Sequence, residues 1–598
     1  MRTRLRFALL AVSASSTIFG FGTGGCGGDD VSSTPEDASV SDVVTTGDSS
    51  TADTSTGDSS ASAAAVANDL TVYVGQTAQL DGSASTPSTA TLTWTIESVP
   101  LGSAIATANL KNASTAKPSF TADVAGDFTL KLTVVSGTDT STKNVKVTAV
   151  YAPVLYGDFS SDAGLNYQEM RVATTAGTNA HALHCTVPDD AGTNPGLLIA
   201  HTSAGGADWW EAPAGQESRF AYVVNERQGD AALYTSYIAA AVTSSSCTGT
   251  PARKLVSATN IAATNAVGFF EQHMPKLSRD GNRVAYVDNR TTGATIATIG
   301  FDGTNAHAHI APYLAYPDGG PQPDASGGIG TPGTRSTFAT LDYYPPRWTQ
   351  AGKLAWAQQL VPTRFQIVTA DDADDATPSL YMACNATRLT SFEMLPDGNV
   401  LASTSISLDG GAAPIDIFVL RPNAVTKECE VVKNLTNLTT AASSATGMSL
   451  SPDGLRVAYI NDDTSTDAGG APTRAALFVA NVDGLTPAAR VPGAPFGAPH
   501  DMGSSVPRNG PRWVAGGSSL TWGQNAATID AGDGGMAIAV IPASGGNATA
   551  IATSGPGHIA FVASSSCSIA RTGGSAVMAF GSLGAFIALA IRRRRKSR

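Results

Sequence analysis

Three histidines are the first candidates for chemistry. His273, His500 and His558 each stand near the start of a recurring strand pattern, where side chains of successive repeats could converge. Neutral imidazole is a common metal ligand. His307 and His309 would share one face of a strand, because side chains alternate along it; the alternative is a solvated loop. The spacing of these histidines matches no metal motif, so we assign no metal.

Acidic and aromatic clusters give further candidates. The segments 371–375 and 462–467 could offer carboxylates to Ca²⁺, but neither has the glycine and terminal glutamate of an EF-hand loop. Calcium therefore stays open as a cofactor, with solvated acidic loops as the alternative. Trp209 and Trp210 follow a glycine-rich loop and could stack on a sugar or peptide; the alternative is packing between repeats. The ligand-binding candidates are Trp209, Trp210, His273 and His500.

No catalytic residue follows from the motifs. The sequence has no Gly-x-Ser-x-Gly word, which excludes the nucleophile elbow of α/β-hydrolases. The cysteines are too widely spaced for a zinc site. We therefore expect no enzymatic activity from the motifs present.

The cysteines predict disulfides. They stand at positions 26, 185, 247, 384, 429 and 567. Cys26 and Cys567 belong to terminal signals, which leaves four in the body of the chain. An even number in an exported protein favours disulfides. Among three connectivities, we favour Cys185–Cys247 and Cys384–Cys429, because each pair closes a loop about one repeat long. The alternative is that they stay reduced and buried.

Both ends of the chain look like export signals. Arg2, Arg4 and Arg6 precede an apolar stretch, which is typical of a secretory signal peptide over residues 1–25. Near the other end, residues 573–591 are uncharged and could span roughly 28 Å as a helix, close to the ~30 Å bilayer core. The basic run 592–598 should stay on the cytoplasmic side. We expect an exported chain attached to a membrane.

The terminal cysteines carry two resemblances. Cys26 follows Thr23-Gly24-Gly25 and resembles the lipid-modified cysteine of bacterial lipoproteins; the alternative is simple cleavage nearby. Cys567, the apolar stretch and the arginine cluster resemble the MYXO-CTERM sorting tails of myxobacterial surface proteins. The second resemblance implies that the tail, residues 564–598, is cut near Cys567. The alternative is an ordinary transmembrane anchor.

The composition indicates which partners the chain can bind and which segment is disordered. The net charge is −12, and the one concentrated basic run is the terminal one, so we expect no nucleic-acid binding. Residues 26–64 are mostly Ser, Thr, Asp, Gly, Ala and Val, without an aromatic residue. Such a segment buries too little apolar area to offset the cost of ordering. It is predicted to be a disordered tether.

Residues 65–150 change to short alternating strands. Leu92, Trp94 and Ile96 should share one face, and residues 128–134 alternate in the same way. Turns about every ten residues favour a β-sandwich. The words Leu80-Asp81-Gly82-Ser83-Ala84-Ser85 and Ala125-Gly126-Asp127-Phe128 resemble PKD-like modules of immunoglobulin fold. The resemblance implies a spacer or adhesive module.

Residues 151–563 repeat one pattern of an apolar strand, a tight turn and a second strand. The word Ser-x-Asp-Gly-x-Arg-Val-Ala-Tyr occurs at 278–286 and 451–459, with looser copies around 217, 351, 397 and 516. An Asp-Gly turn supports a hairpin, and repeats of this size pack radially. A third strand is predicted at 294–299, 365–368, 415–420, 476–480 and 536–541. The motifs resemble the TolB-type β-propeller, and six copies predict six blades.

The predicted fold class is all-β: an immunoglobulin-like β-sandwich, then a TolB-like six-bladed propeller, then a C-terminal transmembrane helix. The favoured function is a cell-surface-anchored, non-enzymatic binding or scaffold protein. We expect a monomer attached to the membrane at its ends, with a surface protein or glycan as ligand. One alternative is a surface polysaccharide hydrolase or lyase using channel histidines, which would resemble propeller-type pectate-fragment lyases. The other is TolB-like envelope assembly.

Overall fold

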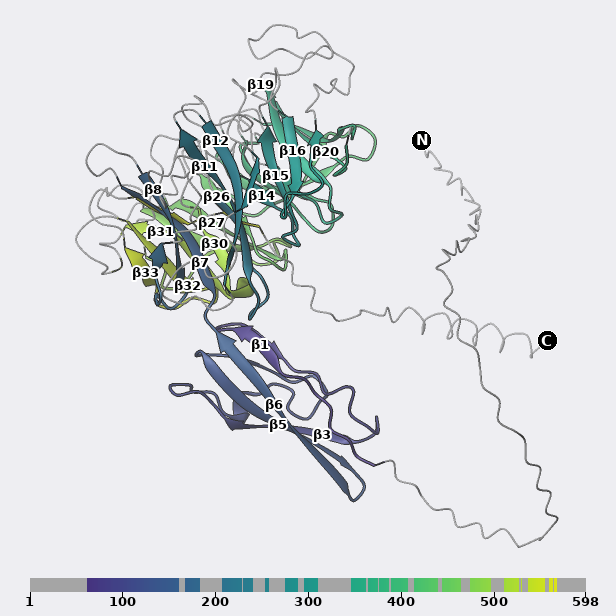
Figure 1. Ribbon diagram of the computed structural model, residues 1–598. Helices are drawn as coiled ribbons and strands as arrows, with labels where there is room; N and C mark the ends of the chain where they lie inside the picture. Colours follow the sequence, from purple (N-terminus) through teal and green to yellow (C-terminus); the bar gives the residue numbers. More distant parts are fainter. Residues whose placement is uncertain are drawn as a thin grey trace, which may run out of the picture. The chain divides into compact units, whose positions relative to one another are not determined.

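The structure is a computed structural model of the 598-residue chain (Figure 1). It describes residues 62–160, 167–182, 207–227, 230–239, 253–256, 275–288, 295–309, 346–361, 364–374, 376–386, 389–406, 413–438, 444–463, 474–495, 510–525, 529, 536–553, 559–562 and 564–566. These residues are almost entirely strands and turns, with short 3₁₀ turns such as η1 (Thr107–Asn109) and η5 (Ala515–Gly517). The all-β fold class is confirmed for this part of the chain.

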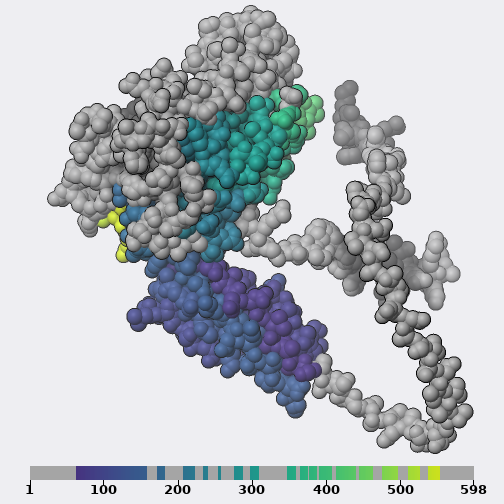
Figure 2. Space-filling view, viewed as in Figure 1, coloured from purple at the N-terminus to yellow at the C-terminus, as the bar shows by residue number. Residues whose placement is uncertain are grey.

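The first domain is a β-sandwich. Its larger sheet has the order β1-β6-β5-β3, and β2 pairs with β4 in a second sheet. Trp94, Phe120, Phe128 and Leu130 fill the core between them and are fully or almost fully buried. Figure 2 shows the surface of this domain, purple to blue, as a closely packed body. The strands are β1 (Leu70–Tyr73), β2 (Thr77–Gln79), β3 (Thr91–Ser98), β4 (Ser119–Thr121), β5 (Gly126–Ser136) and β6 (Asp139–Val150).

Seven antiparallel sheets follow, and we number them along the chain. Sheet 1 holds β7 (Pro153–Ser160), β8 (Tyr167–Thr174), β9 (His181–Ala182) and β34 (Ile559–Val562). Sheet 2 holds β10 (Ala207–Trp210), β11 (Ser218–Arg227), β12 (Asp230–Ile238), β13 (Arg253–Val256) and the parallel β35 (Ser564–Ser566). Sheet 3 holds β14 (Lys276–Leu277), β15 (Arg283–Asp288), β16 (Thr295–Gly300) and β17 (His307–His309).

The other four sheets repeat the same order. Sheet 4 holds β18 (Arg347–Trp348), β19 (Leu354–Val361), β20 (Arg364–Ala370) and β21 (Ser379–Asn385). Sheet 5 holds β22 (Leu389–Met394), β23 (Val400–Thr404), β24 (Asp416–Pro422) and β25 (Cys429–Asn434). Sheet 6 holds β26 (Ala445–Leu450), β27 (Arg456–Asp463), β28 (Arg474–Asn481) and β29 (Ala489–Arg490); sheet 7 holds β30 (Arg512–Val514), β31 (Ser519–Asn525), β32 (Met536–Pro542) and β33 (Thr549–Thr553).

The count of six repeats is wrong by one, since seven sheets lie in the described residues. Sheet 1 has no Asp-Gly word and draws β34 from the far end of the repeats, where it pairs antiparallel with β7. Ser564–Ser566, predicted to open the sorting tail, instead pair with β10.

The Asp-Gly words form the predicted hairpin turns. In sheet 3 the Asp280 carboxylate accepts the Asn282 amide proton at 3.1 Å, and the Ser278 hydroxyl accepts that of Arg283 at 2.9 Å. Gly281 has φ of +69°, which an L side chain rarely adopts. A Cβ on Gly281 would also lie 2.7 Å from the Trp210 ring. The glycine therefore allows the backbone conformation of the turn and also leaves room for the Trp210 ring of sheet 2.

Neighbouring sheets share apolar cores. Separate clusters join sheets 2 and 3, 3 and 4, 4 and 5, 5 and 6, and 6 and 7. One further cluster combines Leu155 of sheet 1 with Trp209 of sheet 2 and Ile538 of sheet 7. Each sheet thus buries its apolar faces against the neighbouring sheets. This is expected of repeats that are too small to bury those faces alone.

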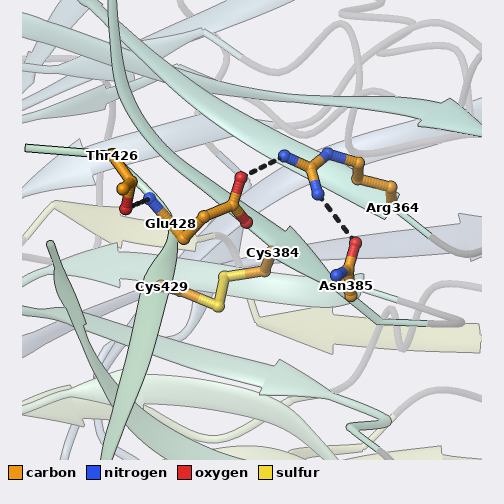
Figure 3. Close-up of a disulfide and its surroundings, with 6 residues drawn as sticks. All are labelled: Arg364, Cys384, Asn385, Thr426, Glu428 and Cys429. Carbon is orange, nitrogen blue, oxygen red and sulfur yellow. Dashed lines mark hydrogen bonds and ion pairs between the residues drawn. A yellow bond between two sulfur atoms is a disulfide. The ribbon is translucent and has the colours of Figure 1, made fainter. Parts of the chain in front are cut away.

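A disulfide crosses between sheets 4 and 5. Cys384 on β21 is bonded to Cys429 on β25, which confirms this predicted pair (Figure 3). Beside it, Arg364 of sheet 4 donates to the Glu428 carboxylate of sheet 5 at 2.5 Å and to Asn385 at 2.8 Å. Sheets 4 and 5 are therefore joined covalently through their outer strands and by an ion pair from β20 to the residue before β25. The predicted pair Cys185–Cys247 lies outside the described residues.

The terminal predictions also lie outside the described residues. They comprise the signal peptide, most of the tether, Cys26, Cys567 and the predicted span 573–591. Among the residues that are described, no helix is long and apolar enough to cross a bilayer.

Candidate functional site

In sheets 2 to 7 we call the first strand in chain order the inner strand. Each of these six inner strands carries one residue at the equivalent position. Each of these residues pairs directly with the second strand of its own sheet, opposite a buried alanine, leucine or threonine. Because side chains alternate along a strand, the equivalent position points the same way in every sheet. We call this set the inner-strand ring; it consists of Asp208, Lys276, Arg347, Glu393, Ser449 and Arg512.

Asp208 and Lys276 form a buried ion pair between sheets 2 and 3. The Lys276 ammonium lies 3.2 Å from Asp208 Oδ1, and the Leu277 amide donates to Asp208 Oδ2 at 2.7 Å. Asp208 is fully buried, and the Lys276 side chain is 11% exposed. Burial lowers the pKa of Lys276, and the Asp208 charge opposes that shift. The carboxylate thus stabilises a buried cation.

Arg347 and Glu393 form the second pair, between sheets 4 and 5. Arg347 Nε donates to Glu393 Oε1 at 2.9 Å and also to the Phe392 carbonyl at 3.2 Å. Arg512 of sheet 7 is half-buried, and its Nη1 donates to the Pro511 carbonyl at 3.0 Å. A guanidinium carries five N–H donors, so it can contact several acceptors at once. The ring therefore mixes two carboxylates, three cations and the Ser449 hydroxyl.

Charges from several sheets act on the Lys276 ammonium. The Lys276 ammonium is stabilised by Asp208 and then opposed by Arg347 and Arg512, while Glu393 favours it. Arg512 belongs to sheet 7, which is not a chain neighbour of sheet 3. Side chains from four other sheets thus act electrostatically on the Lys276 ammonium of sheet 3, so these charged groups lie within electrostatic range of it.

Indole groups fix the strands that carry the ring. Trp348 follows the ring residue of sheet 4 and donates its N–H to the Lys276 carbonyl at 3.1 Å. Trp513 follows the ring residue of sheet 7 and donates to the Ser449 carbonyl at 2.9 Å. Both rings are buried. Each inner strand is thereby held to the strand of the preceding sheet.

The sequence analysis missed this ring. Its signal was available, because Lys276, Arg347, Glu393, Ser449 and Arg512 each stand five residues before a turn glycine. Asp208 breaks that spacing, since the turn of sheet 2 is longer. A charged residue inside an otherwise apolar strand is the sequence feature that indicates such a ring.

The predicted tryptophan platform is not present. Trp209 is fully buried in the core shared by sheets 1, 2 and 7. Trp210 is partly buried; its N–H donates to the Arg279 carbonyl at 2.9 Å, and the Arg219 guanidinium lies 5.6 Å from its ring centroid. The packing alternative is the one that the structure favours, because an inner strand buries alternate residues on the neighbouring sheet.

The acidic segment between β20 and β21 of sheet 4 is paired with basic side chains. Asp372 pairs with Arg283, Asp371 lies 2.7 Å from the Lys353 ammonium, and Asp374 lies 2.9 Å from His307 Nδ1. Within the described ranges no group of three or more metal-ligating side chains is found. His307 therefore lies in a strand beside a carboxylate rather than in a loop. The histidines His273, His500 and His558 lie outside the described residues.

A second cluster of polar contacts joins the sandwich to sheets 2 and 7. Glu211, buried just after β10, accepts the amide protons of Ala515 and Gly516 at 2.7 and 2.9 Å. The Tyr73 hydroxyl, on β1 of the sandwich, donates to the Ala212 carbonyl at 2.9 Å. Tyr73 also packs with Ala152 and Ala515 in a small apolar core. We call these contacts the joint.

Burial dominates the electrostatics of the joint. It raises the pKa of Glu211 to about 7, against the opposing effect of the two amide donors. Burial also raises the pKa of the Tyr73 phenol, and the nearby Glu211 charge adds to that shift. A carboxyl group is thus held where its charge is poorly solvated.

Comparisons with known proteins do not assign this chain to a family. No family model matches it, and no curated protein matches it. Similar solved structures include TolB from Acinetobacter baumannii (14% identity, 60% of this chain, 75% of that chain, TM-score 0.31). An oligogalacturonate lyase from Vibrio parahaemolyticus is 12% identical over 67% of this chain and 86% of its own, with a TM-score of 0.36. A PKD domain is 25% identical over 14% of this chain and 83% of its own, with a TM-score of 0.13. These scores are too low to support any argument about function.

Proposed function

We propose that the chain is a cell-surface-anchored, non-enzymatic binding protein whose seven sheets close into a TolB-like β-propeller. Closure is supported by the apolar cluster that combines sheets 7, 1 and 2, and by β34, which returns from the end of the repeats to pair with β7. A closed arrangement leaves no sheet face exposed at either end of the series. The predicted signal peptide, Cys26 lipidation and sorting tail at Cys567 would place it on the envelope; the mass of the mature protein would test them.

The observation that carries the binding proposal is the inner-strand ring. Five of its six residues are charged at a position where packing alone would favour apolar side chains. The two ion pairs, Asp208–Lys276 and Arg347–Glu393, hold four of the ring side chains in position. Ser449 of sheet 6 and Arg512 of sheet 7 add further hydrogen-bond donors. Guanidinium and hydroxyl donors together suit a carboxylate. The ligand we propose is a carboxylate-bearing chain on a surface glycan or protein.

Replacing Arg512 by glutamine should weaken binding of such a ligand about tenfold or more, because a hydrogen bond to a charged group contributes about 1.5–3 kcal/mol. The probes are polygalacturonate and poly-glutamate, titrated calorimetrically into the mature protein, with a neutral glycan as the blank. The matched control is Arg421→Gln, an exposed arginine near the end of β24 in sheet 5, which should leave the affinity unchanged.

Equal affinity in the wild type and the Arg512→Gln variant would contradict the ring as the site. Product release from either probe, lost in His273→Ala and metal-dependent, would instead support the hydrolase or lyase alternative. Binding with neither probe would remove the carboxylate assignment.

A further inference from the structure

We infer that the joint between the sandwich and the sheets is a pH-sensitive lock, tight when Glu211 is protonated and weakened when it ionises. The proposal is independent of the ligand proposed for the ring. It concerns whether the sandwich holds one fixed position against sheets 2 and 7.

The sandwich contacts the same turn that binds Glu211. Ala515 and Gly516 of η5 donate their amide protons to the two carboxylate oxygens. The Gln76 side chain lies so close to Gly516 that a Cβ there would be 2.8 Å from its amide nitrogen. Ser518, at the end of the turn, donates to the Val74 carbonyl at 3.5 Å. The β1–β2 turn of the sandwich therefore lies against the carboxylate's own partners.

On the other side, the sandwich meets the segment that carries Glu211. The Tyr73 hydroxyl donates to Ala212, the next residue, and the Ala212 amide donates to Ser218 Oγ at 3.1 Å. A Cβ on Gly215 of the same turn would lie 3.1 Å from the Thr71 methyl group. Strand β1 thus holds both turns that enclose the carboxylate. Separating the sandwich would let water reach Glu211.

The charged and titratable groups around the joint are few among the described residues. Tyr73 faces Glu211 from β1, and Arg456 of sheet 6 donates to Gly517 in the adjacent turn at 3.1 Å. From sheet 2 itself come Asp208, three residues earlier, and Glu217 in the following turn. None of these lowers the cost of burying the Glu211 charge as water would.

The direction of the pH effect follows from proton linkage. Burial raises the pKa of Glu211 from 4.5 to about 7, so a joint whose opening exposes Glu211 to water binds the proton more tightly when closed. Closure is therefore most favourable below pH 4.5 and loses stability as pH rises toward 7. A difference of 7 − 4.5, or 2.5 units, corresponds to a change of up to about 300-fold in the opening equilibrium.

Hydrogen exchange of the mature protein, measured by mass spectrometry and corrected for intrinsic rates, tests the lock. Protection of the Ala515 and Gly516 amides should fall by up to about 100-fold between pH 4.5 and 7.5, since protection reports local opening and half of Glu211 in the opened state is already ionised at pH 4.5. The turn amide of Gly352, whose turn residues 349–352 include no acid, should show no such slope. Glu211→Gln should remove the slope.

A second variant keeps the test decisive if the glutamine variant folds poorly. Tyr73→Phe removes the bond to Ala212 but keeps the carboxyl group, so protection should fall about fivefold at every pH with the slope retained. Constant protection of Ala515 and Gly516 in the wild type would overturn the lock. A slope that persists in Glu211→Gln would assign the effect to another group and overturn it equally.

Discussion

Replacing Asp208 by alanine is expected to lower the free energy of unfolding by about 3–5 kcal/mol, because it leaves the Lys276 ammonium buried without its carboxylate. Lys276 is 11% exposed and lies close enough to Arg347 and Arg512 to be repelled by both. The Leu277 amide would lose its acceptor as well. Denaturant unfolding of the mature protein measures the loss.

Two further variants separate the buried charge from ordinary truncation. The double variant Asp208→Ala with Lys276→Met should recover part of the loss, since it removes the unpaired buried ammonium while the Leu277 amide still lacks its acceptor. Asp371→Ala removes the partner of Lys353 in an exposed pair and should change stability by about 1 kcal/mol at most. A single variant Asp208→Ala as stable as Asp371→Ala would contradict a buried pair at the ring.

Removing the Cys384–Cys429 bridge with alanine at both positions should destabilise the protein by about 4 kcal/mol. The two cysteines are 45 residues apart, and the chain-entropy cost of closing a loop of that length in the unfolded state has this size. The bridge joins the outer strands of sheets 4 and 5, so its loss should be felt first there. Thermal unfolding of the oxidised variant and wild type measures the difference.

The neighbouring ion pair provides the control for the bridge. Arg364→Gln breaks the contact with Glu428, which is 39% exposed, and should change stability much less than loss of the bridge. Reducing the wild type should reproduce the alanine variant. A reduced wild type with unchanged stability would show that the bridge adds nothing to the fold.

Local turn chemistry made most of the repeats predictable. The Asp-Gly words predicted hairpins that the structure confirms, and each predicted third strand overlaps an observed one, β16, β20, β24, β28 and β32. Alternation placed Leu92, Trp94 and Ile96 on one face of β3, where Trp94 is fully buried. Such features depend on residues close in sequence, so the pattern alone specifies them.

The pairing of strands that lie far apart in the chain could not be predicted from the sequence. β34 joins β7 from about 400 residues away, and nothing local in Ile559–Val562 indicates its partner. The outer strands were also missed, because short edge strands such as β29 carry little apolar pattern. Glu211 was not among the residues singled out from the sequence, because only the approach of the Ala515 turn makes it a buried acceptor.

An experimental structure of the mature protein tests the central claim most directly, since all else depends on the convergence of the inner strands. The account predicts seven sheets in a closed series, with β34 paired to β7. Asp208, Lys276, Arg347, Glu393 and Arg512 should surround one shared centre. Six sheets, an open series, or Arg512 pointing away from Lys276 would contradict it.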